Sequence, residues 1–354
     1  MSRPYVSVLI DTFNHERFIA DAVSSVLSQD LAASEREVVV VDDGSTDRTA
    51  EILHGFEPEV RVLRKRNGGQ ASAFNCGIPE CGGQLVAFLD GDDWWAPAKL
   101  SAVVEAFANN PDVGLIGHSI IEVLSDGKQR TEMVRDAERF RVDSIADAKI
   151  FRMRKSFLGT SRMAYRSELL RRIGQVPETL TVEADEFLFT LGAVFSEVLL
   201  LREPFTFYRL HGQNLFQTSA LPAVRRKHTV LVALAEALNR RLEQERVPPA
   251  VARTVVESIE IEADALRASL GEGLPWETFR AELRTYKQHH ENASGLRYAL
   301  KFVSAVPALF LPPRTYNSFK NSIASHSLYR SIRNKFFPFH DPGHVDRSEN
   351  WKAR

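Results

Sequence analysis

Residues 85–94 read Leu-Val-Ala-Phe-Leu-Asp-Gly-Asp-Asp-Trp, an apolar run that ends in a cluster of carboxylates. An apolar run that stops at a polar turn is typical of a strand buried in a parallel sheet. Asp90 and Asp92, one residue apart, can share a divalent cation and the ribose of a nucleotide, because Mg²⁺ and Mn²⁺ prefer oxygen ligands. The stretch therefore predicts a strand that brings acidic ligands to the edge of a sheet.

The same pattern occurs twice earlier in the chain. The strand-like run 6–10 ends at Asp11, and the run 37–41 ends at Asp42 and Asp43. Helical patterns separate these runs, which predicts an α/β fold with a mostly parallel, doubly wound sheet. One aspartate at such a position is usually a turn or cap residue. Three acidic clusters at equivalent strand ends instead favour a ligand site that holds a cation and phosphates.

Length, charge and cysteine content narrow the class of protein. The 354 residues favour two domains, and the formal net charge of −1 argues against a general nucleic-acid binder. Cys76 and Cys81 lack the second ligand pair of a zinc site, so we expect reduced thiols in a reducing compartment. No signal-peptide core is visible, and no run reaches the ~18 apolar residues of a membrane span. We therefore expect a cytoplasmic protein.

The pattern changes to helix from about residue 220. Leucines at 231, 234, 238 and 242 form one apolar stripe, and further stripes begin at Val251 and Trp276. We expect an α/β domain at 1–215, a helical region at 216–337 and a polar tail at 338–354. Residues 297–337 contain no Asp or Glu and interleave Lys and Arg with aromatic residues. This segment predicts either a surface that binds an anionic membrane or a packed tail with a basic outer face. The first alternative would place the protein at the inner face of the membrane.

Six segments together carry a family resemblance: VSVLIDTFN (6–14), VVVDDGSTD (39–47), NGGQASAFNCG (67–77), LDGDDW (89–94), EADEFL (183–188) and YRLHGQN (208–214). In order and spacing they resemble the inverting, metal-dependent glycosyltransferases of family 2, which have the Rossmann-like GT-A fold. The resemblance covers residues 4–214. It implies transfer of a sugar from a nucleoside-diphosphate sugar, with uridine favoured, to an acceptor hydroxyl of a glycan or lipid-linked acceptor. Surface polysaccharide or glycolipid synthesis would be the setting.

The resemblance also implies roles for individual residues. The nucleotide would be bound by Asp11, Phe13, Asp43, Asn67, Gly69, Gln70 and Asp90. Mn²⁺ or Mg²⁺ would be held by Asp92 and His211, although a lone histidine is more often structural. Residues near the acceptor or supporting the site would be Asp93, Trp94, Glu183, Glu186 and Asn214.

Asp185 is the expected catalytic base. The family pair at this point is Glu-Asp, whereas this chain has Ala184 followed by Asp185. Asp185 is favoured over Glu183 and Glu186 because Leu188 then falls at the apolar position of the helix. A carboxylate can take the proton of an acceptor hydroxyl as its oxygen attacks the anomeric carbon. The competing interpretation is a solvated helix start, where the helix dipole favours acidic residues.

Two other functions remain alternatives. A nucleotidyltransferase on a related fold would favour a glycine-rich loop with Arg or Lys after the first strand, but residues 11–14 read DTFN. A non-catalytic nucleotide-binding or scaffold protein could have kept the fold, and Ala184 leaves that open. The intact Asp43, Asp90, Asp92 and Asp185 favour the enzyme.

Overall fold

The structure, a computed structural model, describes residues 5–211, 221–289 and 295–325 of the chain. These residues form two compact units. The first contains residues 5–211 and 248–251, and the second contains 221–247, 252–289 and 295–325. The domain boundaries near 215 and 337 stay predictions, because both positions lie outside the described residues.

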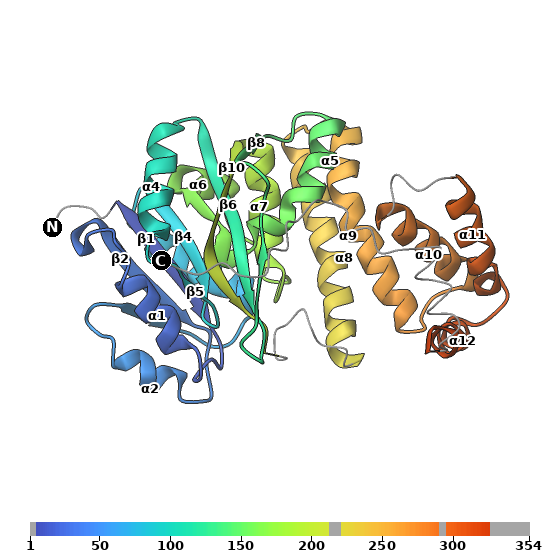
Figure 1. The fold of residues 1–354 in the computed structure, drawn as a ribbon, viewed down its shortest axis with the longest axis horizontal. Coiled ribbons are helices and arrows are strands. Elements are labelled where there is room, and N and C mark those ends of the chain that lie inside the picture. Colours follow the sequence, from blue (N-terminus) through green and yellow to red (C-terminus); the bar gives the residue numbers. More distant parts are fainter. Residues whose placement is uncertain (1–4, 212–220, 290–294, 326–354) are drawn as a thin grey trace. The chain divides into compact units, whose positions relative to one another are not determined.

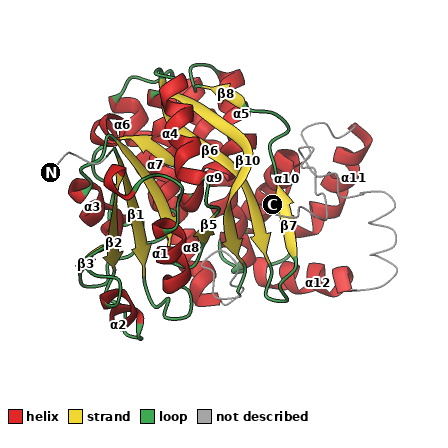
Figure 2. Cartoon of the chain, turned by 60° about the vertical axis from the view of Figure 1, so that its left-hand side comes forward, coloured by secondary structure: helices red, strands yellow, loops and turns green. Residues whose placement is uncertain are grey.

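One mixed sheet forms the centre of the first unit (Figure 2). Its strands are β1 (Val6–Thr12), β2 (Arg36–Asp42), β3 (Arg61–Arg64), β4 (Leu85–Asp90), β5 (Trp94–Trp95), β6 (Val113–Val123), β7 (Gln129–Glu132), β8 (Glu138–Phe140), β9 (Ala164–Arg166) and β10 (Glu197–Arg209). The order is β3-β2-β1-β4-β9-β6-β10-β5, with β7 beside β6 and β8 beside β10. Strands β3, β2, β1 and β4 are parallel neighbours, as are β6 and β10, whereas β5, β7, β8 and β9 pair antiparallel. The predicted α/β class is confirmed.

Helices cover both faces of this sheet (Figure 1). They are α1 (Ile19–Leu27), α2 (Thr49–His54), α3 (Gln70–Gly77), α4 (Lys99–Asn109), α5 (Ile145–Arg154), α6 (Ser167–Ile173) and α7 (Ala184–Phe195). Apolar residues of α1 and α4 join one face of β1 in a single buried cluster that includes Val8, Ile19 and Val103. On the other face, Gly77 of α3 lies against Leu9. Buried residues on both faces explain the near-continuous apolar runs of the central strands.

Two segments differ from the periodicity in the sequence. The runs 197–201 and 204–210 suggest two strands, but they form the single strand β10, with register shifts near Pro204. The apolar residues of 157–165 do not form one strand. They form 3₁₀ turns η3 (Lys155–Leu158) and η4 (Thr160–Arg162) before the short β9.

The second unit is helical. It contains all of α8 (Leu221–Gln244), most of α9 (Pro249–Ser269), and all of α10 (Pro275–His289), α11 (Gly295–Ala305), 3₁₀ turn η5 (Val306–Leu309) and α12 (Pro313–Ser325). The leucine stripe of α8 is buried as predicted, and Lys227 of α8 pairs with Glu262 of α9 at 2.8 Å. The stripe that begins at Trp276 is different, because Trp276 is 49% exposed. No helix among the described residues is long and apolar enough to cross a membrane.

Candidate active site

The carboxyl ends of β1, β2 and β4 bring the predicted acidic residues to one edge of the sheet. Asp11 of β1 is in register with Asp90 of β4, and Thr12 of β1 is in register with Asp42 of β2. Asp43 follows at once, and its backbone N–H donates to the carbonyl oxygen of Thr12 at 2.9 Å. Carboxylates from three strands thus meet at the edge where open α/β sheets bind ligands.

Asp43 organises the loop between β3 and α3. Its buried carboxylate accepts hydrogen bonds from Lys65 Nζ at 2.6 Å, from the Gly68 N–H at 3.0 Å and from the Gly69 N–H at 2.7 Å. Gly69 has φ of 84°, a conformation that side chains disfavour. Asn67 is exposed on the same loop. Asp43 therefore holds the predicted nucleotide-binding loop through its backbone.

Phe13 precedes this loop in the sequence and Gln70 follows it, and the two side chains have different environments. Phe13 follows β1 and is 41% exposed, so its ring is accessible to a ligand. Gln70 begins α3 and is partly buried. Its Nε2 donates to Thr160 Oγ1 at 3.1 Å, and its Oε1 accepts from the Ala184 N–H at 2.9 Å. Gln70 thereby joins the predicted nucleotide-binding loop to the start of α7.

Asp92 contacts two histidines. Its Oδ2 lies 3.0 Å from His211 Nε2 and 3.9 Å from His15 Nε2. Burial alone would raise the pKa of Asp92, but the hydrogen bond with His211 and the charge interaction with His15 lower it below its ordinary value. The two predicted metal ligands, Asp92 and His211, are therefore neighbours, and Asp92 is held as a carboxylate.

Asp93 and Trp94 face the protein rather than an open edge. Asp93 Oδ2 lies 2.6 Å from Ser161 Oγ, and Asp93 Oδ1 accepts from the Arg209 N–H at 2.9 Å. Burial, followed by the charge of the adjacent aspartate, raises the pKa of Asp93 to about 8. Trp94 stacks on Phe207 with ring centroids 5.0 Å apart, and the Arg209 guanidinium lies 4.4 Å from the Trp94 ring. Both residues support the loop from inside.

The acidic trio at the start of α7 is buried. Glu183, Asp185 and Glu186 are each less than a tenth exposed, so the solvated helix start is the wrong interpretation. Asp185 Oδ2 accepts two hydrogen bonds of 3.1 Å from Thr160, one from the backbone N–H and one from Oγ1. Glu186 forms an ion pair with Lys155. Burial, and then the charge of Glu186, raise the pKa of Asp185, which suits a carboxylate that must accept a proton.

The carboxylates of this edge repel one another. Burial, followed by the charge of Asp92, raises the pKa of Asp11 well above its ordinary value, and Asp185 and Asp43 raise it further. Asp90 behaves in the same way, with burial first and Asp11 next. Asp11 Oδ1 is buried without a hydrogen-bond partner among the described residues. A bound cation would relieve both the repulsion and the unpaired oxygen.

Asp92 and His211 form only part of the ligand set that a metal ion needs. Within 5–211, 221–289 and 295–325, no group of three or more His, Cys, Asp or Glu side chains is arranged to hold a metal ion. The pair Asp92 and His211 supplies oxygen and nitrogen ligands suited to a divalent ion. The residues present fit a cation whose remaining ligands come from phosphate and water. Asn214 lies outside the described residues.

Comparisons with known proteins identify the family. The model of glycosyl transferase family 2 matches residues 7–174. An uncharacterised glycosyltransferase of Nostoc sp. is 31% identical over 222 residues, which cover 61% of this chain and 67% of the relative. The uncharacterised glycosyltransferase EpsJ of Bacillus subtilis is 29% identical over 231 residues, which cover 62% of this chain and 65% of EpsJ. The chain belongs to glycosyltransferase family 2.

A solved structure supports the same fold. Residues 1–349 of TarS from Staphylococcus aureus align with a TM-score of 0.53 at 18% identity, covering 90% of this chain and 92% of that chain. In sequence, TarS, a poly(ribitol-phosphate) β-N-acetylglucosaminyltransferase, is 25% identical over 231 residues, which cover 54% of this chain and 40% of TarS. This glycosyltransferase therefore has a GT-A fold followed by a helical region.

Sequence reasoning missed three contributors to the site of this glycosyltransferase. His15 follows the predicted Asp11–Asn14 segment and reaches Asp92. Thr160 and Ser161 lie in the segment 157–165, and nothing in their spacing reveals contacts with residues 25 and 71 positions away. His15 could have been found by extending the first motif, but the two hydroxyl residues could not.

Proposed function

We propose that the protein transfers a sugar from a nucleoside-diphosphate sugar to an acceptor hydroxyl with inversion at the anomeric carbon. The observation that carries the proposal is the convergence of Asp11, Asp90 and Asp92 at one sheet edge with Asp185 at the start of α7. Burial raises the pKa of Asp90 most, and the charges of Asp11, Asp92 and Asp185 raise it further. Four carboxylates from three chain segments would be costly without a ligand to bind. A diphosphate with its cation is such a ligand.

The roles of the chain's residues follow from this geometry. Phe13, Asn67 and the loop that Asp43 orders would bind the base, and Asp90 the ribose. Asp92 and His211 would hold Mn²⁺ or Mg²⁺, which supplies charge neutralisation for the diphosphate when it is bound. Uridine is the base we propose, and the structurally similar TarS chain was solved with UDP-GlcNAc.

Asp185 would act as the base. Its raised pKa, caused mainly by burial, makes the carboxylate a better proton acceptor. The acceptor oxygen attacks the anomeric carbon from the face opposite the diphosphate, the bond from that carbon to the diphosphate oxygen breaks, and Asp185 takes the hydroxyl proton. One displacement of this kind inverts the configuration. A glycan or lipid-linked acceptor of surface polysaccharide or glycolipid synthesis is the acceptor class we propose.

A screen of nucleotide sugars tests the function. Melting temperature is measured with each nucleotide sugar in the presence of Mn²⁺ and of EDTA, since a ligand that binds only the folded state raises it. Donor hydrolysis is then measured with the compounds that stabilise the protein. We expect stabilisation by a uridine-containing donor with Mn²⁺ and slow release of its sugar. Stabilisation without any turnover would instead support the scaffold alternative.

We also propose that the second unit carries a surface that binds the anionic inner face of a membrane. Helix α11 exposes Leu296 by 72%, Leu300 by 44% and Val303 by 66%, and this spacing places them on one side of the helix. Phe310, shortly after α11, is 78% exposed. Apolar side chains in a stretch without acidic residues, 292–340, suit a surface of anionic lipid. Residues 326–337 of the predicted basic segment lie outside the described residues.

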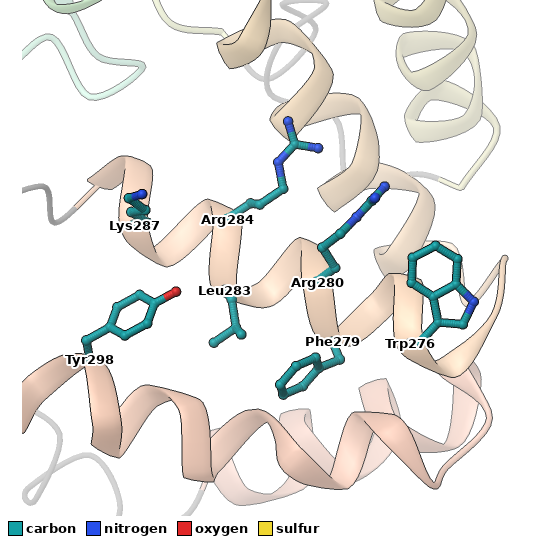
Figure 3. Close-up of a pocket in the computed structure, with 7 residues that line it drawn as sticks. All are labelled: Trp276, Phe279, Arg280, Leu283, Arg284, Lys287 and Tyr298. Carbon is teal, nitrogen blue, oxygen red and sulfur yellow. The ribbon is translucent and has the colours of Figure 1, made fainter.

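A cavity beside α11 is lined by aromatic and basic side chains, which also suit a surface of anionic lipid (Figure 3). Its volume is about 440 Å³, and it is lined by Trp276, Phe279, Arg280, Leu283, Arg284, Lys287 and Tyr298. Arg284 is partly neutralised by Asp264 at 2.8 Å, whereas Lys287 is exposed. Aromatic and basic groups side by side are typical of surfaces that meet lipid headgroups.

Vesicle sedimentation tests the membrane proposal. Wild-type protein should sediment with vesicles of phosphatidylglycerol and phosphatidylcholine, and less so as salt rises. The double variant Leu296→Ser with Val303→Ser should bind at least about tenfold more weakly, because two apolar side chains no longer insert. Ile145→Ser, which removes a side chain 45% exposed on α5, is the matched control. Equal binding of the double variant and the control would overturn the proposal.

A further inference from the structure

The 3₁₀ turn η4 (Thr160–Arg162) contacts both halves of the candidate site. On one side, Thr160 donates to Asp185 Oδ2 from its backbone N–H and from Oγ1, each at 3.1 Å. The same hydroxyl accepts from Gln70 Nε2 at 3.1 Å. Thr160 is 3% exposed, so water cannot replace these bonds without a rearrangement. One threonine thus connects the candidate base to the nucleotide loop.

Ser161, the next residue, contacts Asp90 and Asp93 on the donor side of the site, where the nucleotide sugar would bind. Its Oγ lies 2.6 Å from Asp93 Oδ2 and 3.2 Å from Asp90 Oδ2, and it accepts from the Asp90 N–H at 3.1 Å. A hydroxyl has one proton to donate, so it serves one carboxylate oxygen at a time. Ser161 is also 3% exposed. Adjacent hydroxyls of one turn therefore bind carboxylates of two different loops.

Three other elements fix the position of this turn. The Ser161 carbonyl oxygen accepts from Trp95 Nε1 of β5 at 3.0 Å, from Lys99 Nζ of α4 at 2.6 Å and from Thr206 Oγ1 of β10 at 2.6 Å. A carbonyl oxygen has two lone pairs, so three donors to this one buried carbonyl exceed its usual number of hydrogen bonds. The turn is held as a rigid element, and rigid support is what a preorganised site requires.

We propose that Thr160 and Ser161 are positioning residues that set the placement of the base Asp185 relative to the donor-side carboxylates Asp90 and Asp93. The inference rests on the proposed transfer reaction. Reacting groups must be placed to within fractions of an ångström for efficient transfer. Loss of the Thr160 hydroxyl should disturb the base, whereas loss of the Ser161 hydroxyl should disturb the donor side.

The charges around Asp185 give a signature for the Thr160 hydroxyl. Glu186, Asp11 and Asp90 are the acidic groups that interact with Asp185, and Tyr165 lies near it as a neutral group. Burial and Glu186 raise the pKa of Asp185, while the bonds from Thr160 oppose that rise. A hydrogen bond to the charged form of a carboxyl group stabilises that form. Its removal should therefore move the titration of Asp185 to higher pH.

Two substitutions at position 160 separate the hydroxyl from the side-chain volume. Thr160→Val keeps the volume and removes the hydroxyl, and Thr160→Ser keeps the hydroxyl. We expect Thr160→Val to lower kcat about 10- to 100-fold and to shift the acidic limb of the pH profile upward, with Kd for the nucleotide sugar changed by less than about twofold. Thr160→Ser should recover most of the loss and the wild-type pH limb.

Ser161→Ala tests the donor side. We expect its Kd for the nucleotide sugar to rise about tenfold, because Asp90 and Asp93 lose their shared partner, while the acidic limb of the pH profile stays at the wild-type position. Melting temperatures of all three variants show whether the fold is intact. If Thr160→Val and Thr160→Ser lose the same activity, or if Ser161→Ala shifts the pH limb and spares donor binding, the assignment is wrong.

A measurement without substrate distinguishes this inference from the proposed function. The Asp185 carboxyl is titrated by ¹³C NMR in wild type, Thr160→Val and Thr160→Ser, with Asp185→Asn used to assign its signal. A higher pKa of Asp185 in Thr160→Val alone supports the inference whether or not a donor has been found. Unchanged titration in Thr160→Val overturns it, even if the wild-type protein transfers sugar.

Discussion

His211 Nε2 lies 3.0 Å from Asp92 Oδ2, although the two residues are 119 positions apart in the sequence. His211 also packs on Phe18, with ring centroids 4.6 Å apart, so the imidazole is held from the side as well. A carboxylate and an imidazole already in contact need little rearrangement to bind a divalent ion, which lowers the cost of assembling the site. The pair is therefore the most direct target for testing metal use.

Asp92→Asn should abolish metal-dependent binding of the nucleotide sugar. The amide carries no charge, so the attraction to the cation is lost while the side-chain volume is kept. Isothermal titration of the donor with Mn²⁺ and with EDTA measures the effect. Asp126→Asn, at an exposed turn, is the control and should bind like wild type. Metal-dependent binding by Asp92→Asn at wild-type strength would show that the cation is held elsewhere.

Asp185→Asn should leave donor binding within about twofold of wild type and lower transfer by about 10²- to 10⁴-fold, the range of general base catalysis. The amide oxygen can still accept from Thr160, so the local hydrogen bonding is largely kept. Rates of transfer and donor affinities are measured on the same preparations. Glu183→Gln, which changes the nearby cap residue of α7, should keep transfer. If Glu183→Gln loses transfer and Asp185→Asn keeps it, the base is Glu183 and not Asp185.

The sequence was most informative at strand ends. Asp11 and Asp90 follow buried apolar runs, and the rule that parallel strands end at one edge predicts that they are neighbours, as their register confirms. The turn at Thr160 and Ser161 was not predictable, because its partners are fixed by tertiary contacts. Trp276 was predicted to pack inside and is half exposed, since a helical stripe does not show what covers it.

Lys99 gives a prediction on stability. Its side chain is fully buried, donates to Ser161 and lies 3.6 Å from the Trp95 ring. Burial lowers the pKa of Lys99 well below its ordinary value, and Asp93 only partly opposes this. Between the folded and unfolded pKa values the unfolded state binds more protons, so the stability of the wild type should rise with pH.

Lys99→Met removes this titration and keeps an apolar stem. The free energy of unfolding of wild type relative to Lys99→Met should therefore increase from pH 7 to pH 10, by at most about 1.4 kcal/mol per pH unit. Urea unfolding at each pH provides the values. A difference that stays constant over this range would mean that Lys99 keeps its ordinary pKa in the folded protein.

Gly77→Ala should destabilise the first unit. Gly77 ends α3 where the helix packs on the sheet, and a Cβ there would lie 2.3 Å from Leu9 Cδ1 and 2.9 Å from Val41 Cγ2. Both neighbours are fully buried, so neither can move freely, and overpacking of this kind costs about 1–3 kcal/mol. Gly295→Ala is the matched control, because a Cβ at Gly295 meets no atom within 4 Å. Urea unfolding should give a lower free energy of unfolding for Gly77→Ala than for the wild type, and a wild-type value for Gly295→Ala. If both variants unfold like wild type, α3 lies further from β1 and β2 than the structure shows, and the loop that Asp43 holds would be placed differently as well.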